Sequence, residues 1–337
     1  MPAMEYRRLG RSGLEVSVLC LGTMTFGDRT DVAEAQRIVD AAADAGVNFI
    51  DTADVYVAGE SERIVGAAIR AQRRRWVLAT KVANAVAGRP YDGGLSRRWM
   101  FQACDDSLRR LGTDWIDVWY LHRDDLVTPL AETVGAVGDL IRSGKVRYFG
   151  VSNYRGWRIV EVIRQCDALG VPHPVVCQPY YNLFNRQPEV EVLPACDHYG
   201  LGVAPYSPLA RGVLTGKYAP QAPVPDDSRA ARGDARFLET ENRPESIAIA
   251  QTLREHAARS GRSLTQFALA WLLANRIVSS VIAGPRTLAQ WQDYLTAPGT
   301  AWHADDEALV DALVTPGYAS RHGYHDPQYP FFGRRLA

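Results

Sequence analysis

Short apolar runs alternate with longer amphipathic segments along most of this chain. The eight apolar runs read SVLCLGTM, GVNFIDTA, WVLATKV, IDVWYLH, VRYFGVSN, PVVCQPYYN, LGVAPYSPL and VSSVIAGP. Helical patterns lie between or after them, at residues 32–45, 60–71, 96–111, 130–143, 156–168, 190–199, 245–275 and 287–296. Apolar runs of this length with amphipathic segments between them predict buried parallel strands joined by helices.

Eight strand–helix units that repeat about every 30 residues fit a closed (β/α)8 barrel, the TIM barrel, whose usual length is about 250 residues. An open doubly wound sheet is the alternative, but that fold normally carries G-x-G-x-x-G after its first strand. GTMTFGDRT stands there instead, which favours the barrel. Because no linker divides the chain, we expect residues 1–337 to form a single α/β barrel domain.

Three segments fall outside the eight units. Residues 5–17 place GRSG between short alternating flanks, which predicts an N-terminal β-hairpin. Residues 210–244 are rich in Pro, Arg and Asp and predict a long loop, a kind of segment that is often functional in compact domains. Residues 304–313 predict an extra helix, which is followed by a C-terminal tail rich in Tyr, His and Pro.

Composition narrows the range of partners. The chain has 38 Lys and Arg against 38 Asp and Glu, so its formal net charge is zero and it lacks the basic excess of a nucleic-acid-binding protein. No stretch approaches the roughly 20 apolar residues of a membrane span, and the N-terminus lacks the apolar core of a secretory signal. Five scattered cysteines indicate reduced thiols, so we expect a cytoplasmic protein. The balanced charge favours a small molecule as its partner.

Polar side chains stand at the ends of the predicted strands. The second strand ends in Asp51 with Tyr56 just beyond it, the third in Lys81 and the fourth in His122. The next three strands also end in polar residues: Ser152, Asn153, Gln178, Tyr206 and Ser207. Taken singly, such residues are often structural, as solvent-reaching lysines or turn caps. Because barrel enzymes act at the carboxyl ends of their strands, the joint placement of an acid, a phenol, an amine and an imidazole favours a functional site.

The chemistry of these four residues is coherent. A buried Lys81 needs a compensating charge, which Asp51 can supply. An ammonium nearby lowers the pKa of a phenol from about 10, so we expect Lys81 to lower the pKa of Tyr56 and to make it an effective proton donor. His122 can hydrogen-bond the oxygen that receives the proton. The arrangement suits carbonyl reduction, and because no side chain donates hydride, it implies a nicotinamide cofactor.

The chain resembles the aldo-keto reductases over nearly its whole length. The matching segments are GVNFIDTADVYVAGESERIVG, LATKV, LHRDD, GVSN, CQPYYNL, PYSPLARGVLTGKY and VIAGPRTLAQ, in family order and at family spacing. The resemblance implies a (β/α)8 barrel that uses NADPH. It also implies a catalytic tetrad of Asp, Tyr, Lys and His at Asp51, Tyr56, Lys81 and His122.

The resemblance further implies where NADPH/NADP+ would bind. Residues that match Ser152, Asn153 and Gln178 bind the nicotinamide carboxamide in that family, and an aromatic residue that matches Tyr206 stacks on the ring. The other matching cofactor positions are Gly22, Thr23, Met24, Asp51, Ser207, Pro208, Leu209, Arg211, Gly212, Leu214, Lys217, Gly284, Arg286, Thr287 and Gln290.

Two residues of the adenosine region carry further expectations. Arg286 favours NADP(H) over NAD(H), because a guanidinium fits a phosphate dianion. Tyr294 stands where many relatives place an Asn that bonds the adenine, so the adenine contact departs from the family pattern.

The substrate pocket has several candidates that are as well explained by packing. They are Phe26, Val57, Arg123, Tyr154, Met24 and the C-terminal aromatics from Tyr324 to Phe332. His322 and His325 do not predict a metal site, because no third ligand is evident.

Three functions remain open from the sequence. The first is NADPH-dependent reduction of aldehydes or ketones, including sugar-like ones. The second is an NADPH-binding regulatory subunit with little turnover, similar to potassium-channel β-subunits. The third is a ligand-binding barrel without catalysis, against which the complete tetrad argues.

Overall fold

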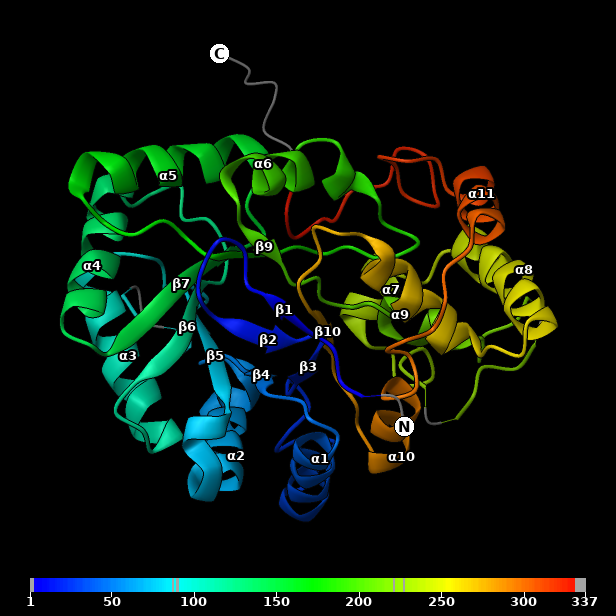
Figure 1. The fold of residues 1–337 in the computed structure, drawn as a ribbon, viewed down its shortest axis with the longest axis horizontal. Helices are drawn as coiled ribbons and strands as arrows, with labels where there is room; N and C mark the ends of the chain where they lie inside the picture. The colour runs from blue at the N-terminus through cyan, green and yellow to red at the C-terminus, as the bar shows by residue number, and fades with distance from the viewer. Residues whose placement is uncertain (1–2, 87, 89–90, 221, 227, 331–337) are drawn as a thin grey trace.

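The computed structural model describes residues 3–86, 88, 91–220, 222–226 and 228–330. Its centre is a parallel sheet in the order β10-β3-β4-β5-β6-β7-β8-β9 (Figure 1). The strands are β3 Leu19–Gly22, β4 Phe49–Asp51, β5 Val77–Val82, β6 Ile116–Leu121, β7 Val146–Ser152, β8 Val176–Gln178, β9 Gly202–Val203 and β10 Val281–Ala283. The two ends of the sheet also meet, because Ile282 N–H donates to the Pro205 carbonyl at 3.0 Å and Ser279 N–H donates to the Val203 carbonyl at 2.9 Å. The predicted (β/α)8 barrel is therefore confirmed.

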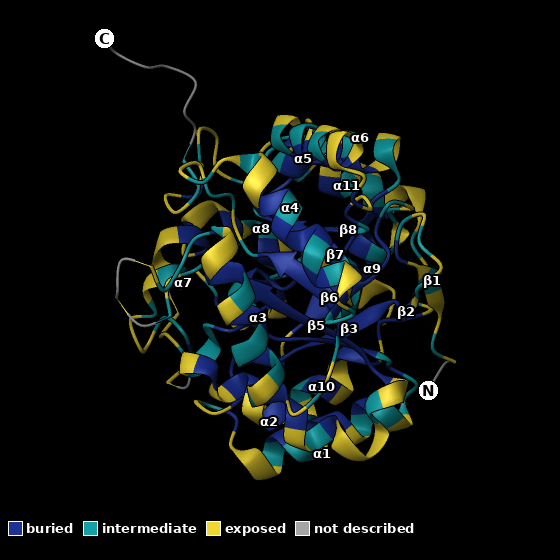
Figure 2. Ribbon diagram, turned by 90° about the vertical axis from the view of Figure 1, so that its left-hand side faces the viewer, coloured by how far each residue is buried: buried dark blue, intermediate teal, exposed yellow. Residues whose placement is uncertain are grey.

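Side chains along the strands alternate between the barrel interior and the surrounding helices. In β5, Val77 and Ala79 belong to the hydrophobic cluster inside the barrel, whereas Leu78 and Val82 belong to the cluster beneath the helices. Figure 2 shows the buried strands enclosed by helices whose outer faces are exposed. The same alternation directs Lys81 into the barrel, near the carboxyl end of the strands.

The helices that surround the sheet follow the predicted amphipathic segments. They begin at polar caps in several places: the Asp31 side chain accepts from the Glu34 amide, and the Ser96 side chain accepts from the Trp99 amide. The helices are α1 Val32–Asp44, α2 Glu60–Ile69, α3 Arg97–Leu111, α4 Leu130–Arg142, α5 Gly156–Leu169, α6 Val192–Tyr199, α8 Pro244–Arg259, α9 Leu264–Ala274 and α10 Leu288–Tyr294.

Two segments differ from the sequence-based expectation. The helical pattern over 245–275 is two helices, because Gly261 adopts a φ of 69° after α8 and Ser263 begins α9 with a capping box. The expected 210–244 loop contains the short helices η4 Ala210–Thr215 and α7 Ala235–Thr240.

The predicted N-terminal hairpin is present and closes the amino end of the barrel. Strands β1 Tyr6–Arg8 and β2 Glu15–Ser17 pair antiparallel. Leu9 and Val16 are fully buried and join the cluster inside the barrel, so the hairpin serves as its floor. The predicted extra helix is α11 Ala304–Leu313. Within the described part of the chain, no helix combines the length and the apolar character needed to cross a bilayer.

The close packing of α2 on α3 predicts that a larger residue at Gly66 destabilises the fold. A Cβ atom added at Gly66 in α2 would lie 2.2 Å from the Leu111 carbonyl oxygen at the end of α3. We expect Gly66→Ala to lower the free energy of unfolding by about 1–3 kcal/mol, because the helix backbones must separate. Urea unfolding followed by circular dichroism measures the change.

Gly135→Ala in α4 is the matched control, since nothing lies within 4 Å of its added Cβ. This variant should gain about 0.5–1 kcal/mol from helix propensity. Equal stability of the Gly66→Ala variant and the parent would contradict the close packing of α2 on α3.

Candidate active site

Four polar side chains meet at the carboxyl end of the barrel. Asp51 ends β4, Lys81 is the next-to-last residue of β5, and His122 follows β6 directly. Tyr56 begins the short 3-10 segment η1, Tyr56–Gly59, just past β4. Because β4, β5 and β6 are neighbours in the parallel sheet, their ends lie side by side, and we refer to these four residues as the tetrad.

The ammonium of Lys81 is fully buried and is held by three acceptors. It forms an ion pair with Asp51 Oδ1, and it donates to the Thr52 carbonyl at 2.7 Å and to the Tyr56 hydroxyl at 3.2 Å. An ammonium has three hydrogen atoms to donate, so these contacts satisfy it completely. Gln178 Nε2 donates to the other oxygen of Asp51 at 3.0 Å, which fixes the carboxylate.

Lys81 keeps its positive charge in this setting. Burial on its own lowers the pKa of Lys81, but the Asp51 carboxylate and the Tyr56 hydroxyl outweigh that effect and raise the pKa above its ordinary value. The side chain is therefore a fixed cation at neutral pH.

Tyr56 keeps its proton. Burial raises the pKa of Tyr56 above its ordinary value, and the nearby Lys81 charge only partly opposes this shift. The expectation that Lys81 brings the pKa of Tyr56 below about 10 is thus wrong for the net effect. The phenol is present as a hydrogen-bond donor across the physiological pH range.

His122 is the neutral member of the tetrad. Burial lowers the pKa of His122 well below its usual range, and the positive charges of Lys81 and Arg123 lower it further. Its ring packs edge-on against Tyr56, with centroids 5.9 Å apart. His122 Nδ1 lies 3.1 Å from Asn84 Nδ2. An amide nitrogen can only donate, so Nδ1 accepts and the proton of the neutral imidazole is on Nε2.

Asn84 is a residue of this site that the sequence analysis missed. It follows Ala83, whose φ of 136° is unusual for a residue with a side chain. Strained backbone of this kind occurs often at functional sites. The unusual backbone angle at Ala83 turns the chain after β5, so that Asn84 reaches His122. No sequence pattern predicts such a turn at an alanine.

The residues expected at the nicotinamide carboxamide lie next to the tetrad. Asn153 Nδ2 donates to the His122 carbonyl at 2.9 Å, and the Tyr206 hydroxyl donates to Asn153 Oδ1 at 2.8 Å. Ser152 Oγ donates to the Gln178 carbonyl at 2.9 Å. Gln178 also contacts Asp51, so this group and the tetrad are one continuous hydrogen-bonded set.

The expected phosphate-binding loop has a strained backbone. Positive φ angles occur at Ser207 (55°), Ala210 (46°) and Arg211 (49°), and Gly212 adopts 104°. Lys217 crosses close to Gly212, since a Cβ added there would lie 3.0 Å from Lys217 Nζ. Loops that combine unusual backbone angles with cationic side chains are suited to bind phosphates. Pro208, Leu209 and Leu214 lie in the same stretch.

The expected adenosine residues gather at the start of α10. Thr287 caps this helix by accepting from the Gln290 amide at 3.3 Å, and Gln290 Oε1 accepts from the Arg286 amide at 2.8 Å. Gly284 lies beside Gly22 of β3, as the register of β10 and β3 requires. Tyr294 is buried at the other end of α10 and packs edge-on against Trp291.

Comparison with known proteins identifies the family. The family model described as "Aldo/keto reductase family" matches residues 18–314. The chain belongs to the aldo/keto reductase family. It is 43% identical over 287 residues to a probable voltage-gated potassium channel subunit beta from Oryza sativa subsp. japonica, which covers 83% of this chain and 87% of that protein.

Two bacterial relatives of this aldo/keto reductase have names of oxidoreductases. The uncharacterized oxidoreductase YrpG of Bacillus subtilis is 40% identical over 307 residues, with 87% of this chain and 91% of that protein covered. The L-glyceraldehyde 3-phosphate reductase of Escherichia coli O157:H7 is 32% identical over 329 residues, with 93% of both chains covered. The family assignment supports an oxidoreductase that acts on carbonyl groups.

This aldo/keto reductase has two further cationic residues near the expected phosphate site, Arg29 and Arg229, which the sequence analysis did not name. Burial lowers the pKa of Arg229, and the positive charges of Arg211 and Arg29 lower it further, so both of these side chains lie near Arg229. Arg229 pairs with Asp234 at 2.6 Å. The density of Arg in the 210–244 segment was the available signal, but the sequence cannot show which Arg turns inward.

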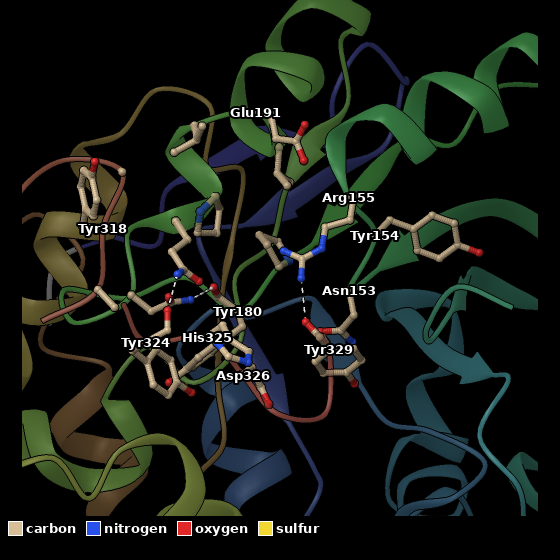
Figure 3. A pocket seen from close by; sticks show the side chains of 18 of the residues that line it. Asn153, Tyr154, Arg155, Tyr180, Glu191, Tyr318, Tyr324, His325, Asp326 and Tyr329 are labelled. Atoms are coloured by element: carbon tan, nitrogen blue, oxygen red, sulfur yellow. Dashed lines mark hydrogen bonds between the residues drawn. The ribbon is translucent and has the colours of Figure 1, made fainter. Parts of the chain in front are cut away.

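The residues expected to line the substrate pocket lie in different surroundings. Phe26 is fully buried in the main hydrophobic core, which fits the packing alternative. Tyr154 lines the cavity drawn in Figure 3, although its ring points away from the other labelled side chains. Val57, with a φ of 49°, follows Tyr56 directly, and the Arg123 guanidinium lies 5.9 Å from the Tyr329 ring.

Three further positions complete the placement of the expected residues. Thr23 Oγ1 donates to the Asp51 carbonyl at 2.9 Å, and Met24 is exposed beside it. Phe331 and Phe332 lie outside the described residues. Among the described residues, no group of three or more His, Cys, Asp or Glu side chains is arranged to hold a metal ion.

The contact between Asn84 and His122 predicts how substitutions of Asn84 change kcat. In this aldo/keto reductase, Asn84→Ala removes the donor to Nδ1, so the proton is no longer held on Nε2. A hydrogen bond of about 1 kcal/mol corresponds to a fall in kcat of roughly 5-fold, with the KM for the cofactor unchanged. Steady-state kinetics of aldehyde reduction across pH 6–9 is the measurement.

Asn84→Asp should behave differently from Asn84→Ala. Its carboxylate would accept from Nδ1–H and raise the pKa of His122, so Nε2 would carry a proton only in the imidazolium form. We expect kcat of this variant to rise as pH falls through the raised pKa, whereas the parent profile stays flat. Parent-like profiles for both variants would contradict a positioning role for Asn84.

Proposed function

We propose that this protein reduces aldehyde or ketone carbonyls to alcohols with NADPH. A bound nicotinamide would supply the hydride to the carbonyl carbon. The donor set fits such a cofactor: Ser152, Asn153 and Gln178 offer a hydroxyl and two amides at the carboxamide position, with the aromatic face of Tyr206 beside them. Cationic side chains in the expected phosphate and adenosine region support the binding of its phosphates: Arg29, Arg211, Lys217, Arg229 and Arg286.

The tetrad supplies the proton in this proposal. Tyr56 gives its hydroxyl proton to the carbonyl oxygen as that oxygen becomes negative. Lys81 stays charged and stabilises the phenolate that remains, and Asp51 holds Lys81 in place. His122 donates from Nε2 to the same oxygen and sets its position.

One observation carries the proposal more than any other. The buried ammonium of Lys81 bridges the carboxylate of Asp51 and the hydroxyl of Tyr56, immediately beside a neutral His122. An ion pair that served only to stabilise the fold would not require a phenol as the third acceptor of the Lys81 ammonium.

We expect the reaction to take place in the cytoplasm, where the five buried cysteines of the chain would remain free thiols.

A second function is supported by the plant relatives. The proteins from Oryza sativa and Arabidopsis thaliana are named as probable voltage-gated potassium channel subunits beta, at 43% and 41% identity. In that alternative the barrel would bind NADPH with little turnover and act as a regulatory subunit.

Turnover separates the two functions. Purified protein is mixed with NADPH and 4-nitrobenzaldehyde or methylglyoxal, and both the loss of NADPH absorbance and the alcohol product are followed. Steady turnover with one alcohol formed per NADPH oxidised is expected. Tight NADPH binding without turnover of a broad aldehyde panel would favour the regulatory subunit.

The proposed preference for NADPH rests on Arg286 and is tested by substitution. Arg286→Ala should weaken NADPH binding by about 1.5–3 kcal/mol, because a charge-assisted hydrogen bond to the 2′-phosphate is lost. NADH, which lacks that phosphate, should bind almost as before. Titration of protein fluorescence with each cofactor gives both dissociation constants.

Arg276→Ala serves as the control, because the Arg276 side chain is exposed and its nearest carboxylate, on Asp197, is 3.4 Å away. It should bind both cofactors like the parent. Equal weakening of NADPH and NADH binding in Arg286→Ala would mean that Arg286 has only a structural role.

A further inference from the structure

A cavity of about 420 Å³ lies beside Asn153, the residue that follows β7 (Figure 3). It is enclosed by the C-terminal segment, residues 317–329, and by the loops that follow β7 and β8. Cavities of this size are typical of small-molecule sites. None of the residues assigned above to the phosphates or to the adenosine lines it, so its occupant is not the cofactor's distal half.

The cavity and the tetrad share a boundary. Asn153 lines the cavity, and its Nδ2 donates to the carbonyl of His122. Tyr329 lines it as well, and its ring faces the guanidinium of Arg123, the residue after His122. A molecule whose carbonyl reaches His122 can therefore extend past Asn153 and Tyr329 into this space.

The walls are rich in aromatic rings. Tyr180, Tyr318, Tyr324 and Tyr329 all line the cavity. Aromatic side chains recognise flat rings through offset or edge-to-face contacts, which aliphatic chains of the same length cannot make. The walls therefore favour a ligand with a planar ring over an extended aliphatic one.

Several charged side chains around the cavity already have hydrogen-bond or ion-pair partners within the protein; the Glu191 carboxylate, for example, accepts from the Gly156 N–H at 3.3 Å. Arg236 binds Asp326 through two contacts, of 3.0 and 2.6 Å, and Arg155 donates to the Tyr329 carbonyl at 2.6 Å. Because these charged groups already have partners, the site favours a neutral ligand.

We propose that this cavity binds the distal ring of an elongated aryl aldehyde or ketone whose carbonyl lies at Tyr56 and His122. The proposal rests on the carbonyl reduction proposed above and names its substrate class. A three-carbon substrate would leave the cavity empty, so the protein would prefer two-ring carbonyls to small ones.

The mouth of the cavity allows a test without disturbing the core. Val190 and Tyr318 both line the cavity, and they are 68% and 50% exposed, so they stand at its opening. Val190→Trp replaces an isopropyl group with an indole there, which should occupy space that the distal ring needs and leave the tetrad end free. Tyr318→Ala removes one aromatic wall.

The experiment compares kcat/KM for benzaldehyde and 4-benzyloxybenzaldehyde. The parent should favour the longer aldehyde by about 10-fold or more, the usual gain from filling an apolar pocket. Val190→Trp should abolish that preference, and Tyr318→Ala should reduce it several-fold, while benzaldehyde reduction stays within about 2-fold of the parent. Leu169→Trp, at an exposed position at the end of α5 and outside the cavity, should leave both rates unchanged.

Two other outcomes are decisive. If Val190→Trp and Tyr318→Ala alter both aldehydes equally, or neither, the cavity does not hold the distal ring and the proposal is overturned. If the parent reduces neither aldehyde, the proposed function fails instead. Calorimetric binding of 4-benzyloxybenzyl alcohol then decides the cavity on its own: binding by the parent that Val190→Trp abolishes supports it, and equal or absent binding overturns it.

Discussion

The buried ammonium of Lys81 is the constraint on which the rest of the site depends. Taking such an ion out of water costs several kcal/mol unless the interior supplies charge and hydrogen bonds in return. Asp51, the Thr52 carbonyl and the Tyr56 hydroxyl supply them. These three groups lie at the end of β4 and in the turn that follows it. The pairing of β4 with β5 and the path of residues 52–56 must therefore both be kept, which links the barrel's register to the position of the phenol.

The protonation states of Lys81, His122 and Tyr56 are suited to the transfer of a proton from Tyr56 to a neighbouring oxygen. Lys81 carries a charge, His122 is neutral, and Tyr56 keeps its proton because burial outweighs the nearby cation. A phenol with a raised pKa holds its proton until an oxygen beside it becomes strongly basic. Lys81 then faces the phenolate that forms. In this account the lysine stabilises the product of proton transfer and does not ionise the phenol beforehand.

Strand periodicity was sufficient to predict the barrel, and the alternation along β5 accounts for the inward direction of Lys81, because alternation along a strand is a local property of the sequence. The division of the 245–275 pattern depends on the φ of Gly261, and the contact of Asn84 depends on the φ of Ala83. A sequence pattern does not encode such single backbone angles. The net pKa of Tyr56 was mispredicted for a related reason: proximity to a cation can be inferred from strand ends, whereas the extent of burial is known only once the surrounding loops are placed.

The most direct test of this account is the single-turnover rate of 4-nitrobenzaldehyde reduction by Tyr56→Phe with saturating NADPH. The substitution keeps the ring and removes only the hydroxyl on which Lys81 converges. NADPH affinity should remain that of the parent, because the residues proposed to bind the carboxamide and the phosphates are other ones. The rate should fall by roughly 10²–10⁴-fold, the usual contribution of a positioned proton donor. A rate near that of the parent would contradict the account and would leave His122 or a water molecule as the source of the proton.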